Sequence, residues 1–421
     1  MDEAVYRTLL RAPGQAYLAA LACLVGACLS CGPLLLATFG QFLAPVTAEF
    51  GWSHASYAGA LTVATVASMA GFPIVGRLVD RYGARPVGIL GTLGYGLAVV
   101  ALGWLQGSLA QLYVLYALAG FFSAAPSTVL YTKIVSSWFA QGRGVMLALT
   151  TGLGGSAGFA VVPQAAEMMM ARFGWRDTYL GLGLLILLVS APLAIACMRE
   201  GGQSADAGEP DGAPGKGGAE ASAGSAVREA LWRREFWLLM GAISLGAGSL
   251  AGLLTHIVPI AGFSGVGTQD ALNLLSIDSV VSCLWQVVLG LLIDRSRSPR
   301  LFALAAFAAA GGALVLGHVA ALPTLYLAAV LLGVGTATDY ALLPYCVARY
   351  FGLRNYGAIF GLIYAVVNLT TGLVPLLLSL SFDLTGDYRV AVGGVAVALV
   401  ACGALLALLP RWPAGAGKSD W

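Results

Sequence analysis

Long apolar runs restrict what this chain can fold into more than any other feature. An α-helix rises about 1.5 Å per residue, so about 20 apolar residues are needed to cross the roughly 30 Å hydrocarbon core of a bilayer. Backbone polar groups cannot be left open in lipid, and each such run is therefore predicted to be a helix. Twelve runs reach about this length, at residues 17–41, 54–76, 86–107, 109–136, 144–170, 175–198, 236–262, 268–293, 301–319, 321–348, 357–382 and 389–410. The sequence thus predicts an all-α polytopic membrane protein with twelve transmembrane helices.

The low charge content excludes a large soluble domain. Only 10% of the 421 residues are charged, whereas soluble domains carry about a quarter, so the lipid bilayer is the expected environment. A net charge of +2 is too small to indicate a nucleic-acid partner, and no basic, aromatic-rich patch occurs. The seven cysteines lie in apolar runs, and no His, Cys, Asp or Glu cluster has metal-ligand spacing. We therefore expect no metal and no cofactor.

A polar break divides the twelve runs into six plus six. Residues 201–226 are rich in Gly, Ala, Pro and acids and show no apolar period, which is typical of a disordered, solvated linker. The sequence predicts an N-terminal six-helix bundle over residues 1–199, a cytoplasmic linker over 200–235 and a C-terminal six-helix bundle over 236–421.

Lysine and arginine are distributed unevenly between the two sides of the predicted bundles. Eighteen of the 22 basic residues fall on the side that carries both termini and the linker, whereas Arg172, Arg176 and Arg389 fall on the other side. The remaining one, Lys133, lies inside the fourth run. Basic loops stay on the cytoplasmic side, so we expect a multi-pass protein of the plasma or inner membrane with both termini in the cytoplasm. The first run is too long for a cleaved signal core and is interpreted as a span.

The two halves of the sequence resemble each other. The segment RLVDRYGARP (77–86) recurs as LLIDRSRSPR (291–300), and aligning Asp80 with Asp294 gives an offset of 214 residues. Aligning the phenylalanine of SWFAQGRG with that of RYFGLRN gives an offset of 212. Because two separate landmarks agree within about two residues, the bundles are expected to be pseudo-symmetric copies. Parallel repeats of this kind are typical of transporters that bind substrate near the bilayer midplane.

The first copy of this segment resembles the signature of the loop between spans two and three in the major facilitator superfamily. The matching residues are Gly76, Asp80, Arg81, Gly83 and Arg85, and the second copy keeps Asp294 and Arg295. The resemblance implies a conformational latch, in which Asp80 docks near the cytoplasmic end of span eleven while Arg81 and Arg85 brace neighbouring helix ends. The alternative is that these charged residues only keep the loop in water on the cytoplasmic side and have no conformational role.

Further tracts resemble the bacterial monocarboxylate and oxalate/formate porter branches of that superfamily: SSWFAQGRGVMLALTTGLGGSAG, ARYFGLRNYGAIFGLIYA and FGWRDTYLGLGLL. The resemblance implies secondary active transport of a small organic monocarboxylate by proton-coupled symport and alternating access, and we expect a monomer. The charged residues that these branches place in spans one, eight and eleven are replaced here by Ala37, Ser282, Gln286 and Asn368. A proton-coupled exporter of amphipathic compounds on the same fold is the alternative. Three scattered histidines and the lack of a GxxxxGK[ST] loop disfavour an enzyme and an ATP-driven pump.

Two acids lie deep inside predicted spans, where ionisable residues are costly and function is the default hypothesis. Asp339 is twelve residues before Phe351 at the cytoplasmic edge, and so lies about 18 Å deep, near the midplane. Asp278 lies about 24 Å deep and heads a polar stripe with Ser282 and Gln286, spaced i, i+4 and i+8. We expect Asp339 to exchange protons, with Asp278 as the second candidate. A fixed structural partner or a direct substrate contact are the alternatives.

The other candidate site residues are one lysine and several neutral polar side chains. Lys133, about 9 Å inside the fourth run, either anchors an anionic substrate or snorkels to the membrane interface. Ser123, Ser127 and Tyr131 are expected on one face of the fourth span, where they either contact the substrate or bridge helices. Tyr364, Asn368 and Thr371 form a similar face on span eleven. The proposed substrate contacts are therefore Lys133, Ser127, Tyr131, Gln286, Tyr364 and Asn368.

Two further features are predicted from spacing. Gly154 and Gly158 form a small-xxx-small pair, which predicts close packing against another helix. His256 lies at the outer end of the seventh span beside Pro259, and is either an interfacial histidine or part of a pH-sensitive outer gate.

Overall fold

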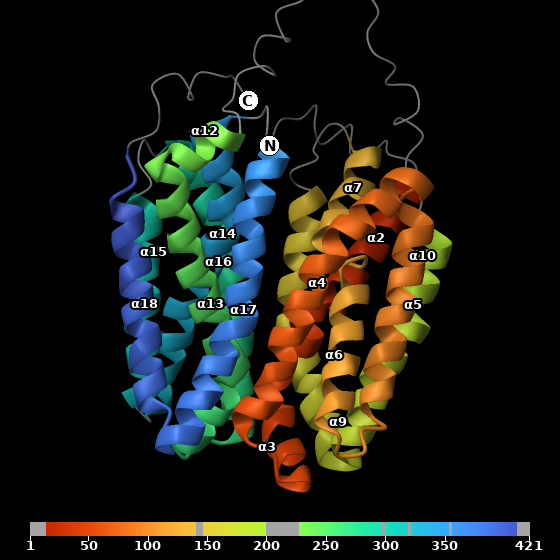
Figure 1. Cartoon of the computed structure of the whole chain (residues 1–421), viewed down its shortest axis with the longest axis vertical. Coiled ribbons are helices and arrows are strands. Elements are labelled where there is room, and N and C mark those ends of the chain that lie inside the picture. Colours follow the sequence, from red (N-terminus) through yellow and green to blue (C-terminus); the bar gives the residue numbers. More distant parts are fainter. Residues whose placement is uncertain are drawn as a thin grey trace, which may run out of the picture. The chain divides into compact units, whose positions relative to one another are not determined.

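Every regular element in the described part of the chain is helical. The computed structural model describes residues 14–139, 146–198, 227–295, 300–318, 321–352 and 356–410. Contacts divide the chain into an N-terminal unit, Met1–Asp211, and a C-terminal unit, Gly212–Trp421. Within each unit the long helices run side by side (Figure 1).

The helices of the N-terminal unit follow the first six predicted runs. In chain order they are α2 (Gly14–Cys28), the π-helical η1 (Gly32–Leu36), α3 (Phe39–Phe50), α4 (His54–Tyr82), α5 (Ala84–Leu102), α6 (Leu109–Ser123), α7 (Thr128–Trp138), the π-helical η2 (Ala148–Gly152), α9 (Leu153–Leu185), the π-helical η3 (Ile186–Ser190) and α10 (Ala191–Cys197).

The C-terminal unit contains six long helices and one short one. They are α12 (Val227–Trp232), α13 (Arg234–Phe263), α14 (Thr268–Arg295), α15 (Arg300–His318), α16 (Leu322–Phe351), α17 (Tyr356–Thr385) and α18 (Arg389–Ala407). The short helix α12 falls inside the expected linker, because its sequence VREALW is rich in good helix formers. The part of that linker before residue 227 lies outside the described residues.

Helix length and composition identify the membrane-crossing segments. Eight stretches of the described residues are long and apolar enough to cross a membrane, and Leu109–Ser123 and Phe302–His318 are shorter apolar helices. The stretch Leu149–Cys197 covers 49 residues, about twice what one crossing needs. Its helical geometry breaks at Gly174, whose φ of 80° and ψ of 172° are accessible only to glycine, so it supplies two membrane-length arms. Together with α14, these helices account for all twelve predicted runs, and the chain is an all-α polytopic membrane protein.

The fourth predicted run is not one continuous helix. α6 ends at Ser123, and α7 begins only at Thr128. Pro126 lies between them, where it has no backbone N–H to donate and disfavours helical geometry in the residue before it. The prediction that Ser123, Ser127 and Tyr131 share one helix face is therefore wrong, because the face does not continue through the break.

Small residues allow α9 to approach α2 closely. A Cβ atom added at Gly154 would lie 2.6 Å from the carbonyl oxygen of Leu24, and one added at Gly158 would collide with the backbone of Cys28. Contacts this short leave no room for any side chain. The predicted close packing at the small-xxx-small pair is confirmed.

Candidate functional site

Asp339 lies in the middle of α16, beside a small cavity of the C-terminal unit. The cavity offers about 20 Å³ to the centres of water molecules, which is room for about one water. Its walls come from α13, α15, α16 and α18, and apart from Asp339 and Thr338 the side chains that line it are apolar or cysteine. The cavity therefore surrounds one carboxyl group with mostly hydrocarbon.

The Asp339 carboxyl packs against the backbone of α13. A Cβ atom added at Gly246 would lie 2.9 Å from Asp339 Oδ1 and 3.3 Å from Cys402 Sγ, so the bare glycine leaves the space that the carboxyl occupies. No hydrogen bond or ion pair reaches this carboxyl from the residues that the structure describes. An ionisable group without a partner inside a span is costly, which makes Asp339 the first candidate for a functional role.

Asp278 has a different environment, between α14 and α16. Its side chain is 3% exposed, and Thr336 Oγ1 donates a hydrogen bond to Oδ1 at 3.3 Å. One turn further along α14, Ser282 Oγ donates to the carbonyl of Gly333 at 2.9 Å. The polar stripe predicted on this helix thus faces α16, and Gln286, its third member, is half-buried. Asp278 thus contacts α16 from α14, whereas the Asp339 carboxyl packs against α13.

Ser127 and Tyr131 come together at the start of α7, where the Tyr131 N–H donates to the Ser127 carbonyl at 3.1 Å. Ser127 is the N-cap residue and has extended backbone angles, yet its hydroxyl does not cap the helix. Both hydroxyl oxygens are buried, and within the described ranges neither has a hydrogen-bond partner. The side chain of Lys133, two residues further on, is exposed. The lysine and the two hydroxyls therefore lie in different surroundings.

The candidates on α17 lie in the C-terminal unit. Tyr364 is 40% exposed and stacks on Phe360, with ring centroids 5.6 Å apart. Asn368 is half-buried, and its carbonyl accepts a hydrogen bond from Thr371 Oγ1 at 2.7 Å.

The loop signature occupies the junction of α4 and α5. Gly83 has a φ of 85°, a conformation that favours glycine, and its N–H donates to Val79 O at 2.9 Å. Arg85 Nη2 donates to the carbonyl of Ile195 at 2.7 Å, in the last turn of α10, where a cation is favourable. Arg85 therefore contacts the end of a second helix in the same unit.

The remaining signature residues are described only in part. Gly76 is exposed near the end of α4, and the Arg81 guanidinium lies over the ring of Tyr82, 5.3 Å from its centroid. The backbone of Asp80 is helical, whereas its side chain and those of Asp294 and Arg295 lie outside the part of the chain that the structure describes.

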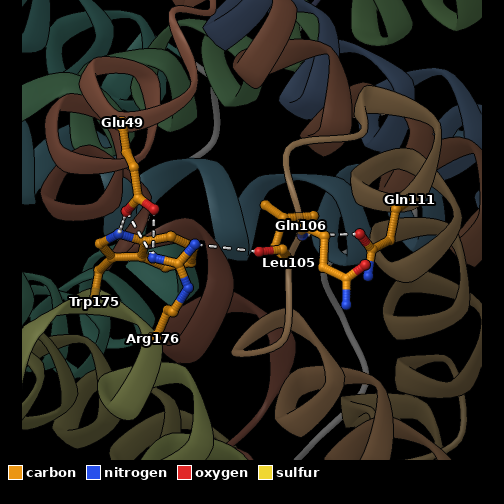
Figure 2. Close-up of polar contacts among 6 residues, drawn as sticks. All are labelled: Glu49, Leu105, Gln106, Gln111, Trp175 and Arg176. Carbon is orange, nitrogen blue, oxygen red and sulfur yellow. Dashed lines mark hydrogen bonds and ion pairs between the residues drawn. The ribbon is translucent and has the colours of Figure 1, made fainter.

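A charged cluster that the sequence analysis missed joins α3 to the second arm of α9 (Figure 2). Glu49 Oε2 accepts hydrogen bonds from Trp175 Nε1 at 2.8 Å and from Arg176 Nη1 at 2.7 Å. Arg176 Nη2 also donates to the carbonyl of Leu105 at 3.3 Å, and its guanidinium lies 4.2 Å from the centroid of a Trp175 ring. We call Glu49, Trp175 and Arg176 the clasp.

The clasp changes the acidity of its carboxyl group, which lies beyond the predicted first span. Hydrogen bonds from Arg176 and then from Trp175 lower the pKa of Glu49 below its ordinary value of 4.5. From the sequence, Arg176 was noted only as one of three basic residues on the side of the predicted bundles opposite the termini. No local signal pairs residues 127 positions apart, so only the folded arrangement of the whole chain reveals this contact.

Buried tyrosines link three helices of the N-terminal unit. The hydroxyls of Tyr57 on α4, Tyr116 on α6 and Tyr179 on α9 form a closed ring of hydrogen bonds at 3.3, 2.9 and 3.1 Å. All three side chains are buried, so each hydroxyl finds its partners inside the ring.

His256 is buried rather than interfacial. Its side chain is 0% exposed, Nε2 hydrogen-bonds Ser379 Oγ on α17 at 2.8 Å, and Nδ1 lies 3.2 Å from the carbonyl of Gly252. The histidine therefore joins α13 to α17. Among the described residues, no group of His, Cys, Asp and Glu could hold a metal ion.

Long apolar helices that enclose carboxyl and hydroxyl groups define a polytopic membrane protein. The sequence profile of the Major Facilitator Superfamily matches residues 25–322 and 268–419. The chain belongs to this superfamily, as its loop signature predicted. Membership indicates a membrane transporter rather than an enzyme, whereas the monocarboxylate and oxalate/formate branches stay predictions.

Two fungal relatives match part of the chain. The MFS transporter asaE of Aspergillus flavus is 31% identical over 134 residues, 30% of this chain and 29% of that protein. The Fujikurins efflux protein of Gibberella fujikuroi is 32% identical over 130 residues, 30% of this chain and 26% of that protein. The chain thus matches less than a third of the length of either relative.

Solved transporter structures share the fold over nearly the whole chain. A bacterial homologue of the human lysosomal transporter Spinster, inward-facing and unoccupied, superposes with a TM-score of 0.66 at 15% identity, covering 94% of this chain and 95% of that one. The nucleoside transporter NupG gives a TM-score of 0.70 at 12% identity, covering 94% and 99%. At these identities the likeness shows the common fold alone.

Proposed function

We propose that this chain is a proton-coupled secondary transporter of small organic monocarboxylates that works by alternating access. The observation that carries the proposal is the Asp339 carboxyl, which borders a cavity with room for about one water and receives no hydrogen bond or ion pair from the described residues. Such a group takes up a proton when its cavity opens to one side of the membrane and releases it when the cavity opens to the other. Asp278, which Thr336 contacts, is the second candidate for this role.

The substrate in this proposal is an anion with one carboxylate. Deep inside the predicted spans the sequence has one basic residue, Lys133, against two acids, Asp278 and Asp339, which does not suit a dianion. Movement of one proton with one monoanion is electrically neutral, so membrane voltage does not oppose it. The proposed substrate contacts are Lys133, Ser127, Tyr131, Gln286, Tyr364 and Asn368.

The proposal includes the sidedness and the moving parts of the transporter. We place both termini in the cytoplasm, in a plasma or inner membrane, and assign two bundles over residues 1–199 and 236–421 with a linker over 200–235. The monomer is the proposed working unit. The proposed conformational latch comprises Gly76, Asp80, Arg81, Gly83 and Arg85, with Asp294 and Arg295 in the second copy.

Uptake by purified protein in liposomes tests the proposal. Lactate, glycerate and 4-hydroxybenzoate are offered with and without an inward proton gradient, and empty liposomes are subtracted because protonated acids cross lipid unaided. We expect accumulation above equilibrium only with the gradient. Asp339→Asn should abolish this accumulation because an amide cannot carry the proton, whereas Asp270→Asn, in the first turn of α14, should leave it unchanged. Accumulation that ignores the gradient would exclude proton coupling.

Export of amphipathic compounds on the same fold is the second candidate function. The partial similarity to the Fujikurins efflux protein favours it. Liposomes in which an exporter is inserted in the outward-pumping orientation would expel a dye such as rhodamine 6G. They would accumulate none of the three acids. The same preparation therefore separates the two functions.

A further inference from the structure

The break between α6 and α7 puts the start of a helix deep inside a span. α7 has 11 residues and begins at Thr128, eleven residues before Phe139, or about 16 Å along a helix. The first backbone N–H groups of a helix have no partner within it and carry partial positive charge. An N-cap side chain commonly satisfies one of them, yet Ser127 makes no such hydrogen bond.

Three hydroxyl groups near this helix start have no partner of their own. Ser127 Oγ, Tyr131 OH and Tyr95 OH are buried oxygens without a hydrogen bond to any described residue. Tyr95 and Tyr131 are each 1% exposed. Buried polar groups are nearly always paired, and each exception needs an explanation. Three such exceptions around one helix start point to a ligand that supplies the missing acceptors.

The three hydroxyl-bearing residues belong to elements that meet near the break, and the Tyr131 hydroxyl packs against Gly26 of α2. Tyr95 lies one turn beyond Gly91 on α5, where an added Cβ would meet Ala125 and lie 3.3 Å from Pro126 Cδ, so this face of α5 packs on the break itself. Long side chains on a helix lean toward its N-terminus, which directs Tyr131 back toward the start of α7.

We propose that the substrate carboxylate binds at the start of α7, where it accepts hydrogen bonds from the hydroxyls of Tyr95, Ser127 and Tyr131 and from the first backbone N–H groups of the helix. The inference rests on the proposed function, since it takes a monocarboxylate as the substrate. Every group in this set can donate a hydrogen bond, and helix starts favour anions. Neutral donors thus recognise the charge, and the exposed Lys133 is not required to hold the carboxylate.

The site must open for the substrate to enter. The three hydroxyl oxygens are closed to solvent, and residues 124–127 connect α6, which ends at Ser123, to α7, which begins at Thr128. This segment lacks regular helical hydrogen bonding, so it is the natural place for α6 and α7 to move apart.

Calorimetric titration of the purified full-length chain with lactate tests the inference, with lactamide as the uncharged probe. Tyr95→Phe, Ser127→Ala and Tyr131→Phe should each weaken lactate binding about tenfold or more, because each removes a hydrogen bond to a charged group. Without ligand these variants should melt at the same or a higher temperature than the wild type, since each loses a buried hydroxyl that has no partner. Tyr116→Phe is the matched control: it breaks the hydrogen-bonded tyrosine ring, so it should lower the melting temperature and leave lactate affinity unchanged.

The outcomes separate this inference from the proposed function. Unchanged lactate affinity in all three variants, with normal binding by the wild type, would overturn the helix-start site and leave the proposed function standing. The site would also be overturned, with the proposed function intact, if Lys133→Ala alone abolished binding. Wild-type protein that neither binds nor accumulates any of the three acids would overturn both. Equal affinity for lactate and lactamide would show that the charge is not recognised, and would also overturn the site.

Discussion

At the residue scale, Gly246 leaves the space that the Asp339 carboxyl occupies. A methyl group added by Gly246→Ala would lie 2.9 Å from Asp339 Oδ1. Because the carboxyl is the flexible end of the Asp339 side chain, we expect the carboxyl to move and not the backbone of α13. We expect this variant to reduce gradient-driven uptake about tenfold, equivalent to about 1.4 kcal/mol, because it displaces the group proposed to bind the proton. The free energy of unfolding should fall by only about 1 kcal/mol, the lower end of the cost of overpacking. Liposome uptake and thermal unfolding measure the two effects.

The control for this variant lies on the same helix. At Gly241 the nearest atom to an added Cβ is Leu405 Cδ1 at 3.5 Å, an ordinary contact, so Gly241→Ala should leave both uptake and stability near wild type. If the two substitutions reduced uptake equally, the loss would come from a change in α13 as a whole and not from displacement of the Asp339 carboxyl.

At the scale of elements, the clasp fastens the end of α3 to the second arm of α9. Because hydrogen bonds from Arg176 and Trp175 lower the pKa of Glu49 in the folded protein, the clasp stabilises the fold above the unfolded pKa. This contribution is lost as pH falls through the lower folded pKa. Glu49→Gln should therefore reduce the free energy of unfolding near pH 7 by about 0.5–1 kcal/mol, as for a partly exposed ion pair. Thermal unfolding in detergent from pH 7 down to pH 3 measures it.

A neighbouring carboxylate provides the control. Asp177 follows Arg176 and is exposed, so Asp177→Asn should leave the pH profile of unfolding almost unchanged. If Glu49→Gln lost as much stability at pH 3 as at pH 7, the ionised carboxylate would not be the group that holds the clasp.

The elements could be predicted from sequence, but the way they break and face one another could not. About 20 apolar residues mark a span by themselves, and the depth of Asp339 follows from counting along one helix. A proline in the sequence does not by itself show whether its span will be interrupted. Pro73, Pro163 and Pro375 lie within helical segments that continue on both sides of them, whereas Pro126 lies between the end of α6 and the start of α7. Neighbouring helices re-satisfy the freed backbone groups in most cases, so the outcome depends on tertiary packing. For the same reason the cavity wall on α13 and the partners of Glu49 were missed.

At the scale of the whole molecule, the basic residues predict its sidedness. In the predicted topology, the side with both termini carries Arg77, Arg81 and Arg85, and the opposite side carries the clasp residue Arg176. We expect epitope tags at residues 1 and 421 to be labelled only in permeabilised cells, and a tag in the α5–α6 loop (residues 103–108) to be labelled in intact cells, because basic loops are retained in the cytoplasm.

If an inserted tag disturbs folding at one of these positions, labelling of a single cysteine introduced at that position makes the same measurement. Labelling of both termini in intact cells would reverse the proposed orientation. It would also place the loop signature outside the cell and remove the basis for a cytoplasmic latch.

The cavity beside Asp339 has a consequence for the choice of driving ion. A sodium ion binds through several oxygen atoms or keeps a shell of water, whereas this space holds about one water and its polar side chains among the described residues are one carboxyl and one threonine hydroxyl. A bare proton needs no shell and only one oxygen. Under the proposed function, the small space beside Asp339 therefore favours a proton over a sodium ion as the coupling ion.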